Sequence, residues 1–435
     1  MQPTLAQAFE LRKNKNMAQA LDLYNTLWQQ EPLAFGEWDL WSYGQCLRHT
    51  RAYQQALAVS RAAYTRFAQS TLLNQQYAWC IYYTQIATTP AGAGSSHTAT
   101  LEKAVNAILQ LSPPHTPYSP AVRSIFKTIK HLSTLPHAPW LQMEGWLNRL
   151  DVTQLTQDTY AVALPGKNKQ TELASDVEEW YSWKSKCLLQ QGQWEACLQL
   201  CAEAAANIKK WHYSNDVWFG RRQAACLVQL NRRAEAATLL TQLLRRKKEW
   251  FMLADLAEIT ADPVAALGLY AQAALAYGDP PKKLRLYASM MALLQQQNKA
   301  AEALLHAQLM VALRLQNQWP VAPELMAQAA NGGAVPSVAA LLQQLNPLWS
   351  TWQAGANGTK AAARQLGTVA NLLPNGHAGF IKPEAGGANL YFLIKQYRGA
   401  AQSLRVGLKI SYEIAEGYDN KKQQATQQAV NLRAI

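Results

Sequence analysis

Residues 379–392, Gly-Phe-Ile-Lys-Pro-Glu-Ala-Gly-Gly-Ala-Asn-Leu-Tyr-Phe, decide how the carboxy-terminal part of this chain folds. Two short apolar runs, each alternating between two faces, flank the Gly-rich turn at 385–388. A third alternating run follows at 408–414, and a last one at 427–432. Short strands separated by turn residues predict a small β-barrel.

Strand alternation assigns the side chains of the quoted stretch to opposite faces. We expect one set to face outward, toward a ligand: Ala378, Phe380, Tyr391 and Leu393. The other set is expected to fill the barrel: Gly379, Ile381, Leu390 and Phe392.

The order of these motifs resembles the cold-shock domain family over residues 367–433. Residues 367–369 resemble its first strand, and 379–381 and 389–392 resemble its two nucleic-acid-binding motifs. A further match to its Leu-x-x-Gly-x-x-Val-x-Phe-x-Val run is formed by Leu404, Gly407, Ile410, Tyr412 and Ile414. Residues 429–432 match its closing Ala-x-Asn-Val. The resemblance implies a five-stranded barrel that binds single-stranded RNA or DNA through stacked aromatics and basic side chains.

The resemblance assigns base stacking to Phe380 and Tyr391. Polar contacts to the nucleic acid are expected from Lys382, Lys395, Arg398, Lys409, Lys421, Lys422 and His377. The chain departs from the family where Ala378 replaces an aromatic residue and Leu393 replaces a histidine. Each lost stacking residue removes about 1–3 kcal/mol, so we expect the barrel alone to bind weakly. A barrel that binds protein, or docks on the helices, is the alternative.

The first 330 residues predict helices, because apolar residues recur there at spacings of three and four. Small and aromatic residues return in the same order, as in Trp250, Leu253, Ala254, Ala266 and Tyr270. This pattern resembles tetratricopeptide repeats, in which stacked helix pairs form a solenoid. An irregular helical bundle is the alternative.

Three segments are predicted along the chain. Residues 1–330 form the helical array, 331–366 a linker with one helix, and 367–435 the barrel. Loops are expected near 88–100, 112–120 and 164–169, where Pro, Gly and polar residues gather.

The repeat pattern places five basic residues near a groove lined by the first helix of each pair: Arg12, Lys13, Arg48, Arg221 and Arg285. A cationic groove favours a phosphate backbone or an acidic peptide. Solvated helix faces are the alternative.

The composition favours a polyanionic partner, because the net charge is +13 with 49% apolar and only 16% charged residues. The six cysteines lack the spacing of a zinc site and are expected to be buried thiols in a reducing compartment. No stretch predicts a secretory signal or a membrane span, so we expect a cytoplasmic location. The phosphate-loop, metalloprotease and hydrolase motifs are missing, so neither catalysis nor a cofactor is expected.

The sequence therefore predicts a mainly α protein: a tetratricopeptide-like solenoid followed by a five-stranded cold-shock-type barrel. The predicted function is a non-catalytic nucleic-acid-binding adaptor, with RNA favoured over DNA. The competing hypothesis is a protein-interaction scaffold whose groove holds a partner and whose barrel docks. A role in bacterial stress or defence is a third hypothesis, based on the architecture alone.

Overall fold

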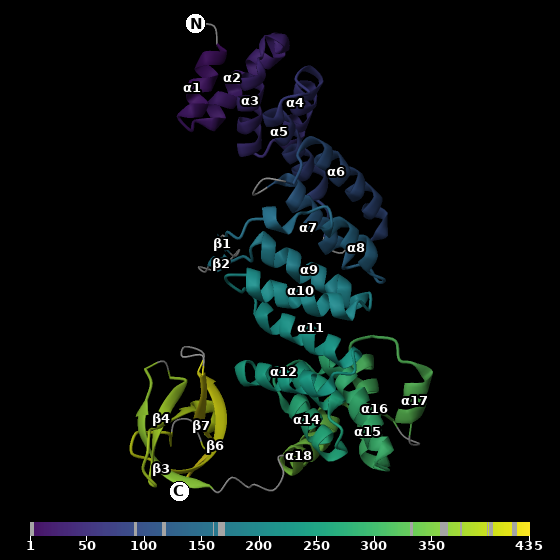
Figure 1. The fold of residues 1–435 in the computed structure, drawn as a ribbon, viewed down its shortest axis with the longest axis vertical. Helices are drawn as coiled ribbons and strands as arrows, with labels where there is room; N and C mark the ends of the chain where they lie inside the picture. Colours follow the sequence, from purple (N-terminus) through teal and green to yellow (C-terminus); the bar gives the residue numbers. More distant parts are fainter. Residues whose placement is uncertain are drawn as a thin grey trace. The chain divides into compact units, whose positions relative to one another are not determined.

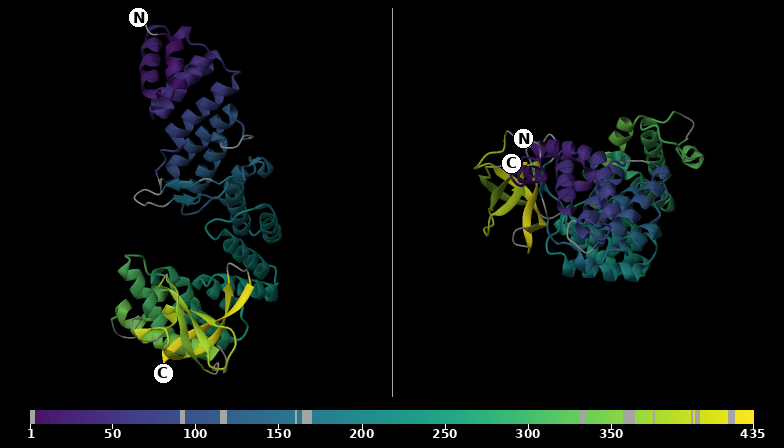
Figure 2. Two further views of the ribbon diagram at one scale, coloured as in Figure 1. Left: turned by 90° about the vertical axis from the view of Figure 1, so that its left-hand side faces the viewer. Right: turned by 90° about the horizontal axis from the view of Figure 1, so that it is seen from above.

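A computed structural model describes residues 4–90, 94–114, 119–159, 161–163, 170–330, 334–356, 364–374, 376–397, 399, 403–419 and 424–435. The chain divides into two compact units, Met1–Arg222 (unit 1) and Gln223–Ile435 (unit 2). Each unit is traced in Figures 1 and 2. The segment boundaries at 330 and 366 stay predictions.

Unit 1 is built from consecutive helices. They are α1 (Leu5–Lys13), α2 (Met17–Gln30), α3 (Glu37–His49), α4 (Tyr53–Arg66), α5 (Thr71–Ile81), α6 (Thr98–Leu111), α7 (Pro120–Leu132), α8 (Trp140–Leu147), α9 (Asp176–Gln190), α10 (Trp194–Asn207) and α11 (Asn215–Gln229), the last of which runs into unit 2. A π-helical turn, Tyr82–Ile86, extends α5. A hairpin of β1 (Ala161–Ala163) and β2 (Gln170–Glu172) flanks the loop expected at 164–169, which lies outside the described residues.

Unit 2 continues the helices and ends in the barrel. The helices are α12 (Arg233–Arg246), α13 (Trp250–Ile259), α14 (Pro263–Leu275), α15 (Leu284–Gln296), α16 (Ala300–Gln316), α17 (Pro323–Ala329) and α18 (Val338–Ala356). The strands are β3 (Gln365–Leu372), β4 (Ala378–Pro383), β5 (Leu390–Leu393), β6 (Lys409–Asp419) and β7 (Gln424–Ala434).

The same three-residue turn joins the two helices of five pairs. Its middle residue has a left-handed backbone, with φ of 64° at Lys15, 62° at Arg51, 74° at Gly192 and 59° at Asn231 and Asn298. The amide of the following residue bonds to the carbonyl five positions earlier, as in Asn16 to Leu11 and Arg232 to Leu227. This Schellman arrangement closes the first helix and lets the second turn back on it. The turns thus repeat in the structure even though their spacing in the sequence is irregular.

Small residues let the helices of unit 1 pack closely. Ala8, Ala20 and Ala56 are buried in one core with Tyr24 and Tyr43. A Cβ on Gly44 would lie 1.9 Å from the side-chain nitrogen of Gln76, so any larger residue on α3 there would force the Gln76 side chain to move. The helices α1, α3 and α5, each the first of a pair, contact one another in order.

The helix expected in the linker, α18, packs on α14 and α16 in unit 2. Trp349 anchors it, stacked on Tyr287 with ring centroids 5.7 Å apart and donating its indole N–H to His306 Nε2 over 3.0 Å. The helix α18 is therefore part of the core of unit 2.

The strands of unit 2 close into a barrel in the order β3-β4-β5-β7-β6, with β5 and β7 parallel and the other pairs antiparallel. Its core contains Ile381, Phe392, Ile410 and Tyr412. A Cβ on Gly379 would lie 2.5 Å from the Asn371 carbonyl oxygen and 2.8 Å from the Phe392 ring. The predicted fold class, a mainly α helical-repeat array followed by a five-stranded barrel, is confirmed.

Two predicted loops are partly occupied by helix. Within 88–100, a 3₁₀ turn at Ser95–His97 leads into α6 from Thr98. α6 ends at Leu111, just before the loop expected at 112–120, and α7 begins at Pro120, the last residue of that range. Residues 91–93 and 115–118 lie outside the described residues.

Candidate nucleic-acid interface

Phe380 and Tyr391 form a cross-strand pair on the outside of the barrel. They lie directly opposite each other on β4 and β5, and their ring centroids are 5.7 Å apart at an interplanar angle of 70°. Both side chains are partly exposed, while Ile381 and Phe392, the next residue on each strand, are buried. The strand period therefore turns two aromatic rings outward, as base stacking requires.

One expected outward residue is not on the surface. Ala378 is 1% exposed, so the prediction that this side chain faces a ligand is wrong. β4 pairs with β5 without a register shift from Ala378 to Ile381, so Ala378 keeps the face of Phe380 but is covered by neighbouring residues.

Several basic side chains are exposed on the barrel. Lys382 is exposed two residues beyond Phe380, on the same face of β4. Lys395 and His377 are also exposed, and both lie at the end of the β4–β5 ladder where Ala378 pairs with Leu393. Lys409 is exposed on β6, with Nζ 3.9 Å from a carboxylate oxygen of Glu384. The remaining predicted contacts, Arg398, Lys421 and Lys422, lie outside the described residues.

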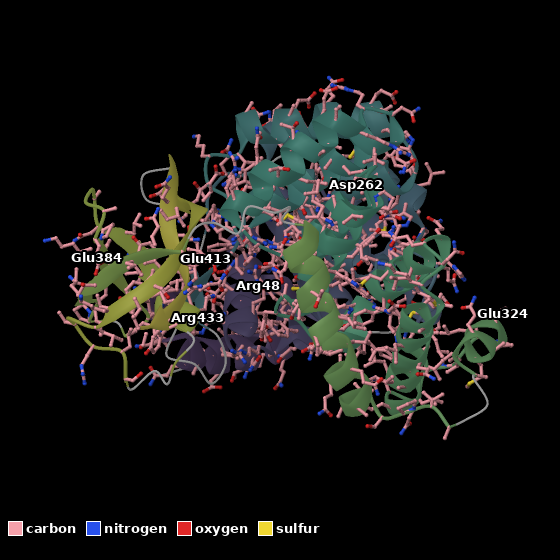
Figure 3. The ribbon with its side chains drawn as sticks, turned by 90° about the horizontal axis from the view of Figure 1, so that it is seen from below. Arg48, Asp262, Glu324, Glu384, Glu413 and Arg433 are labelled. Carbon is pink, nitrogen blue, oxygen red and sulfur yellow. The ribbon has the colours of Figure 1, made fainter. Side chains whose placement is uncertain are left out.

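The charge of the barrel segment is positive. Residues 364–435 hold nine Lys and Arg and four Asp and Glu, a difference of five positive charges. Two of the four acidic residues already have basic neighbours within the barrel, because Glu413 pairs with Arg364 at 3.0 Å and Glu384 lies beside Lys409. Glu384, Glu413 and Arg433 are labelled in Figure 3.

A second set of side chains in unit 1 combines cations with aromatic rings. The guanidinium carbon of Arg12 on α1 lies 5.0 Å from the Phe9 ring centroid and 4.9 Å from that of Trp41 on α3. Arg48 on α3 lies 5.9 Å from the ring of Trp79 on α5. These contacts join successive first helices of the pairs, which is where a groove was predicted.

The set continues on α9 and α11. Lys186 Nζ lies 4.2 Å from the Trp183 ring, and Arg222 lies 4.8 Å from the Phe219 ring. Arg221 lies 5.9 Å from the ring of Trp218. We call all of these residues the cation–aromatic set: Phe9, Arg12, Trp41, Arg48, Trp79, Trp183, Lys186, Trp218, Phe219, Arg221 and Arg222.

Three arginines of the cation–aromatic set carry a buried N–H without a hydrogen-bond acceptor. Among the described residues, no partner is found for Nε of Arg12, Nε of Arg48 or Nη1 of Arg222. Ring stacking holds each guanidinium in place but satisfies none of these donors. These three guanidinium groups therefore keep unused hydrogen-bonding capacity.

The other two predicted groove residues lie apart from the cation–aromatic set. Arg285 is highly exposed and sits 3.3 Å from a Glu258 oxygen. Lys13 is exposed, with Nζ 4.0 Å from a Glu10 oxygen. Such exposed pairs contribute little energy.

Sequence reasoning missed Lys186 and Arg222, although a signal was present. An aromatic residue stands three positions before the cation at Phe9, Trp146, Trp183, Trp218 and Phe219. Side chains three apart lie together on a helix, and each of these pairs is in contact.

No metal or membrane signal accompanies these surfaces. The described residues contain no group of three or more His, Cys, Asp or Glu placed to hold a metal ion. None of the helices that the structure describes is long and apolar enough to cross a bilayer. All six cysteines are buried, and burial raises the pKa of Cys46 to about 11.

Comparisons with known proteins give one family match. Residues 217–340 match the family described as a domain of unknown function, DUF7017. This segment holds most of α11, all of α12 to α17 and the first residues of α18, with Arg222 near its start. No curated protein matches the chain.

Solved structures align with the chain only loosely. A tetratricopeptide repeat protein from Parabacteroides merdae is 12% identical, with 80% of this chain and 97% of that chain covered, at a TM-score of 0.23. The C-terminal part of a TPR repeat-containing protein from Cytophaga hutchinsonii is 11% identical, covering 69% and 99%, at 0.33. A monomeric mutant of IFIT1 with m7Gppp-AAAA is 10% identical, covering 80% and 79%, at 0.33. At these scores the likeness carries no argument. The evidence for the helical-repeat architecture is the chain's own helix pairs and turns.

Proposed function

We propose that this chain is a non-catalytic RNA-binding adaptor. The barrel contacts single-stranded RNA through Phe380 and Tyr391, and unit 1 contacts RNA through the cation–aromatic set. The observation that carries the proposal is the pair of outward aromatic rings on adjacent strands of a positively charged barrel.

The geometry of the pair supports stacking on bases rather than a structural role. Aromatic side chains that serve only the fold are normally turned inward, as Phe392 and Tyr412 are here. Phe380 and Tyr391 are held edge to face, so each fixes the other in position before a ligand arrives. Lys382 lies two residues beyond Phe380 on the same strand face, where it can neutralise a phosphate next to a stacked base.

The test is RNA binding by the full chain carrying Phe380→Ala together with Tyr391→Ala. We expect the affinity for single-stranded RNA to fall at least about fivefold, because one or two stacks of about 1–3 kcal/mol each are lost. The control is Tyr277→Ala, which removes a fully exposed aromatic ring on the helical part of unit 2. Equal RNA affinity in the barrel variant and the control would remove the barrel face from the proposal.

A protein-interaction scaffold is the second candidate function, favoured by one contact within unit 2. Arg245 on α12 and Glu416 on β6 are 3.2 Å apart, and a docked barrel would use such contacts. Both side chains are largely exposed, so this pair alone contributes little. Salt separates the two functions, because RNA affinity falls by about 0.7 log units per contacted phosphate for each log unit of salt. A scaffold would show no RNA binding even at low salt.

A further inference from the structure

Arg222 is a buried cation without a counter-charge. The residue is 8% exposed, and its Nη1 has no partner among the described residues. It stacks on Phe219. The groups facing it on α10 are the thiols of Cys197 and Cys201 rather than carboxylates, and Cys197 donates its own proton to the Ser185 carbonyl.

A second cation interacts with Arg222 from α9. The ammonium of Lys186 is held over the Trp183 ring. The pKa of Lys186 is lowered to about 8, mainly by burial and secondly by the charge of Arg222. Two cations that repel each other in a partly buried site are destabilising unless a negative charge compensates them.

The nearby carboxylates on α9 are already paired with α7. Glu179 lies 2.7 Å from Lys130 Nζ, and Asp176 lies 3.6 Å from Arg123. Burial raises the pKa of Asp176. Glu179 also attracts Lys186 and offsets part of its charge, whereas the groups that act on Arg222 are thiols and another arginine. Among the described residues, the charge of Arg222 is therefore left uncompensated.

We infer that Lys186 and Arg222 form a phosphate-binding site between α9 and α11, in which one phosphate of a bound single strand supplies the missing negative charge. The fixed fork of a guanidinium and the compact ammonium suit phosphate oxygens. The aromatic rings beneath both cations hold them in position before binding. The inference rests on the proposed function for the source of the phosphate, but the site can be tested with inorganic phosphate alone.

The first experiment compares thermal unfolding of the full chain in sodium phosphate and in sodium chloride at equal ionic strength. Arg222→Met and Lys186→Met are compared with Arg149→Met. Arg149 also follows an aromatic residue by three positions and stacks on it at 4.2 Å, but its guanidinium is exposed and bonds to Asn106 over 2.6 Å. We expect phosphate to raise the melting temperature of the wild type and of R149M, and to have no such effect on R222M or K186M.

Chloride alone gives a second readout. Removing an uncompensated buried charge should leave the melting temperature of R222M equal to or above that of the wild type. A lower value for R222M in chloride, with its phosphate response intact, would mean that Arg222 only supports the fold, and would overturn the inference. If R222M does not fold, the test depends on K186M. An unchanged stabilisation of K186M by phosphate would also overturn the inference.

The second experiment measures binding of a uridine oligonucleotide over a salt series. We expect R222M to reduce the slope of log affinity against log salt by about 0.7, the contribution of one phosphate on a single strand. An unchanged slope rejects the site and leaves the proposed function standing. A phosphate response without any oligonucleotide binding supports the site and rejects the proposed function. A third outcome is that polyglutamate, and not phosphate, stabilises the wild type but not R222M. That result would overturn the choice of phosphate as the ligand.

Discussion

His306 is a titratable residue buried in a core that it helps to organise. It is fully inaccessible, its Nδ1–H donates to the Glu302 carbonyl over 2.7 Å, and its Nε2 accepts from Trp349. Both ring nitrogens are therefore satisfied only while the imidazole is neutral. Burial lowers its pKa to about 4, from 6.5.

We predict that unit 2 loses stability as the pH falls from 6.5 to 4. In this window the unfolded chain binds a proton at His306 that the folded chain does not, so acid favours unfolding. The loss approaches ~3 kcal/mol at pH 4. Urea unfolding at several pH values measures it.

His306→Gln should flatten this pH dependence, at the cost of lower stability at pH 7. His137→Gln, which removes an exposed histidine, should leave the dependence unchanged. A wild type whose stability is constant from pH 6.5 to 4 would contradict a buried neutral imidazole.

Gly379 is the second residue whose environment sets a clear expectation. Gly379→Ala should destabilise the barrel by about 1–3 kcal/mol, because a methyl group there overlaps the Asn371 carbonyl and the Phe392 ring. Gly145→Ala serves as the control, since its Cβ meets open space on α8. That change should be neutral or should stabilise by up to about 1 kcal/mol. Denaturant titrations followed by far-ultraviolet circular dichroism compare the two variants.

The sequence predicted best those features that depend on residues close together in the chain. Phe380 and Tyr391 were predicted correctly as an outward pair, because strand alternation is local. The burial of Ala378 was not predicted, because it depends on tertiary packing, which strand alternation does not describe. Arg221 was chosen over Arg222, since only packing of α9, α10 and α11 shows which adjacent arginine is buried.

At the scale of elements, α18 depends on Trp349 for its attachment. Trp349→Phe keeps a ring on Tyr287 but leaves Nε2 of His306 without a donor, which costs about 1–3 kcal/mol. Trp349→Ala should cost about 3–5 kcal/mol, because it also leaves a cavity. Hydrogen exchange of α18 amides should rise in the same order. Trp319→Ala, at a much more exposed tryptophan, should change neither quantity.

Helix pairing was only partly predictable for a related reason. The Schellman turns at Gly192, Asn231 and Asn298 use residues that readily adopt a left-handed backbone, and these could be found from sequence. The turns at Lys15 and Arg51 use residues that rarely do so. Packing of the helices on either side must impose the turn there, and sequence composition gives no hint of it.

At the scale of the whole molecule, the proposal places two weak RNA contacts on one chain. We predict that the barrel variant (Phe380→Ala with Tyr391→Ala) and Arg222→Met each weaken binding of an RNA of about 40 nucleotides more than binding of one of about 6 nucleotides. Only the longer RNA can engage both contacts at once and gain from effective concentration. Anisotropy titrations of both RNAs with each variant measure the difference. Equal losses on both lengths would mean that the contacts act separately.

Closure of the barrel limits how any partner can be recognised. Within the ring β3-β4-β5-β7-β6 each strand has a neighbour on both sides over part of its length. Beyond Tyr412 on β6 and before Gln428 on β7, the described pairing is that of these two strands with each other. An extended peptide could therefore add as a further strand along this projecting hairpin, the route by which many modules capture peptides. Where the ring is closed on both sides, recognition must proceed through side chains.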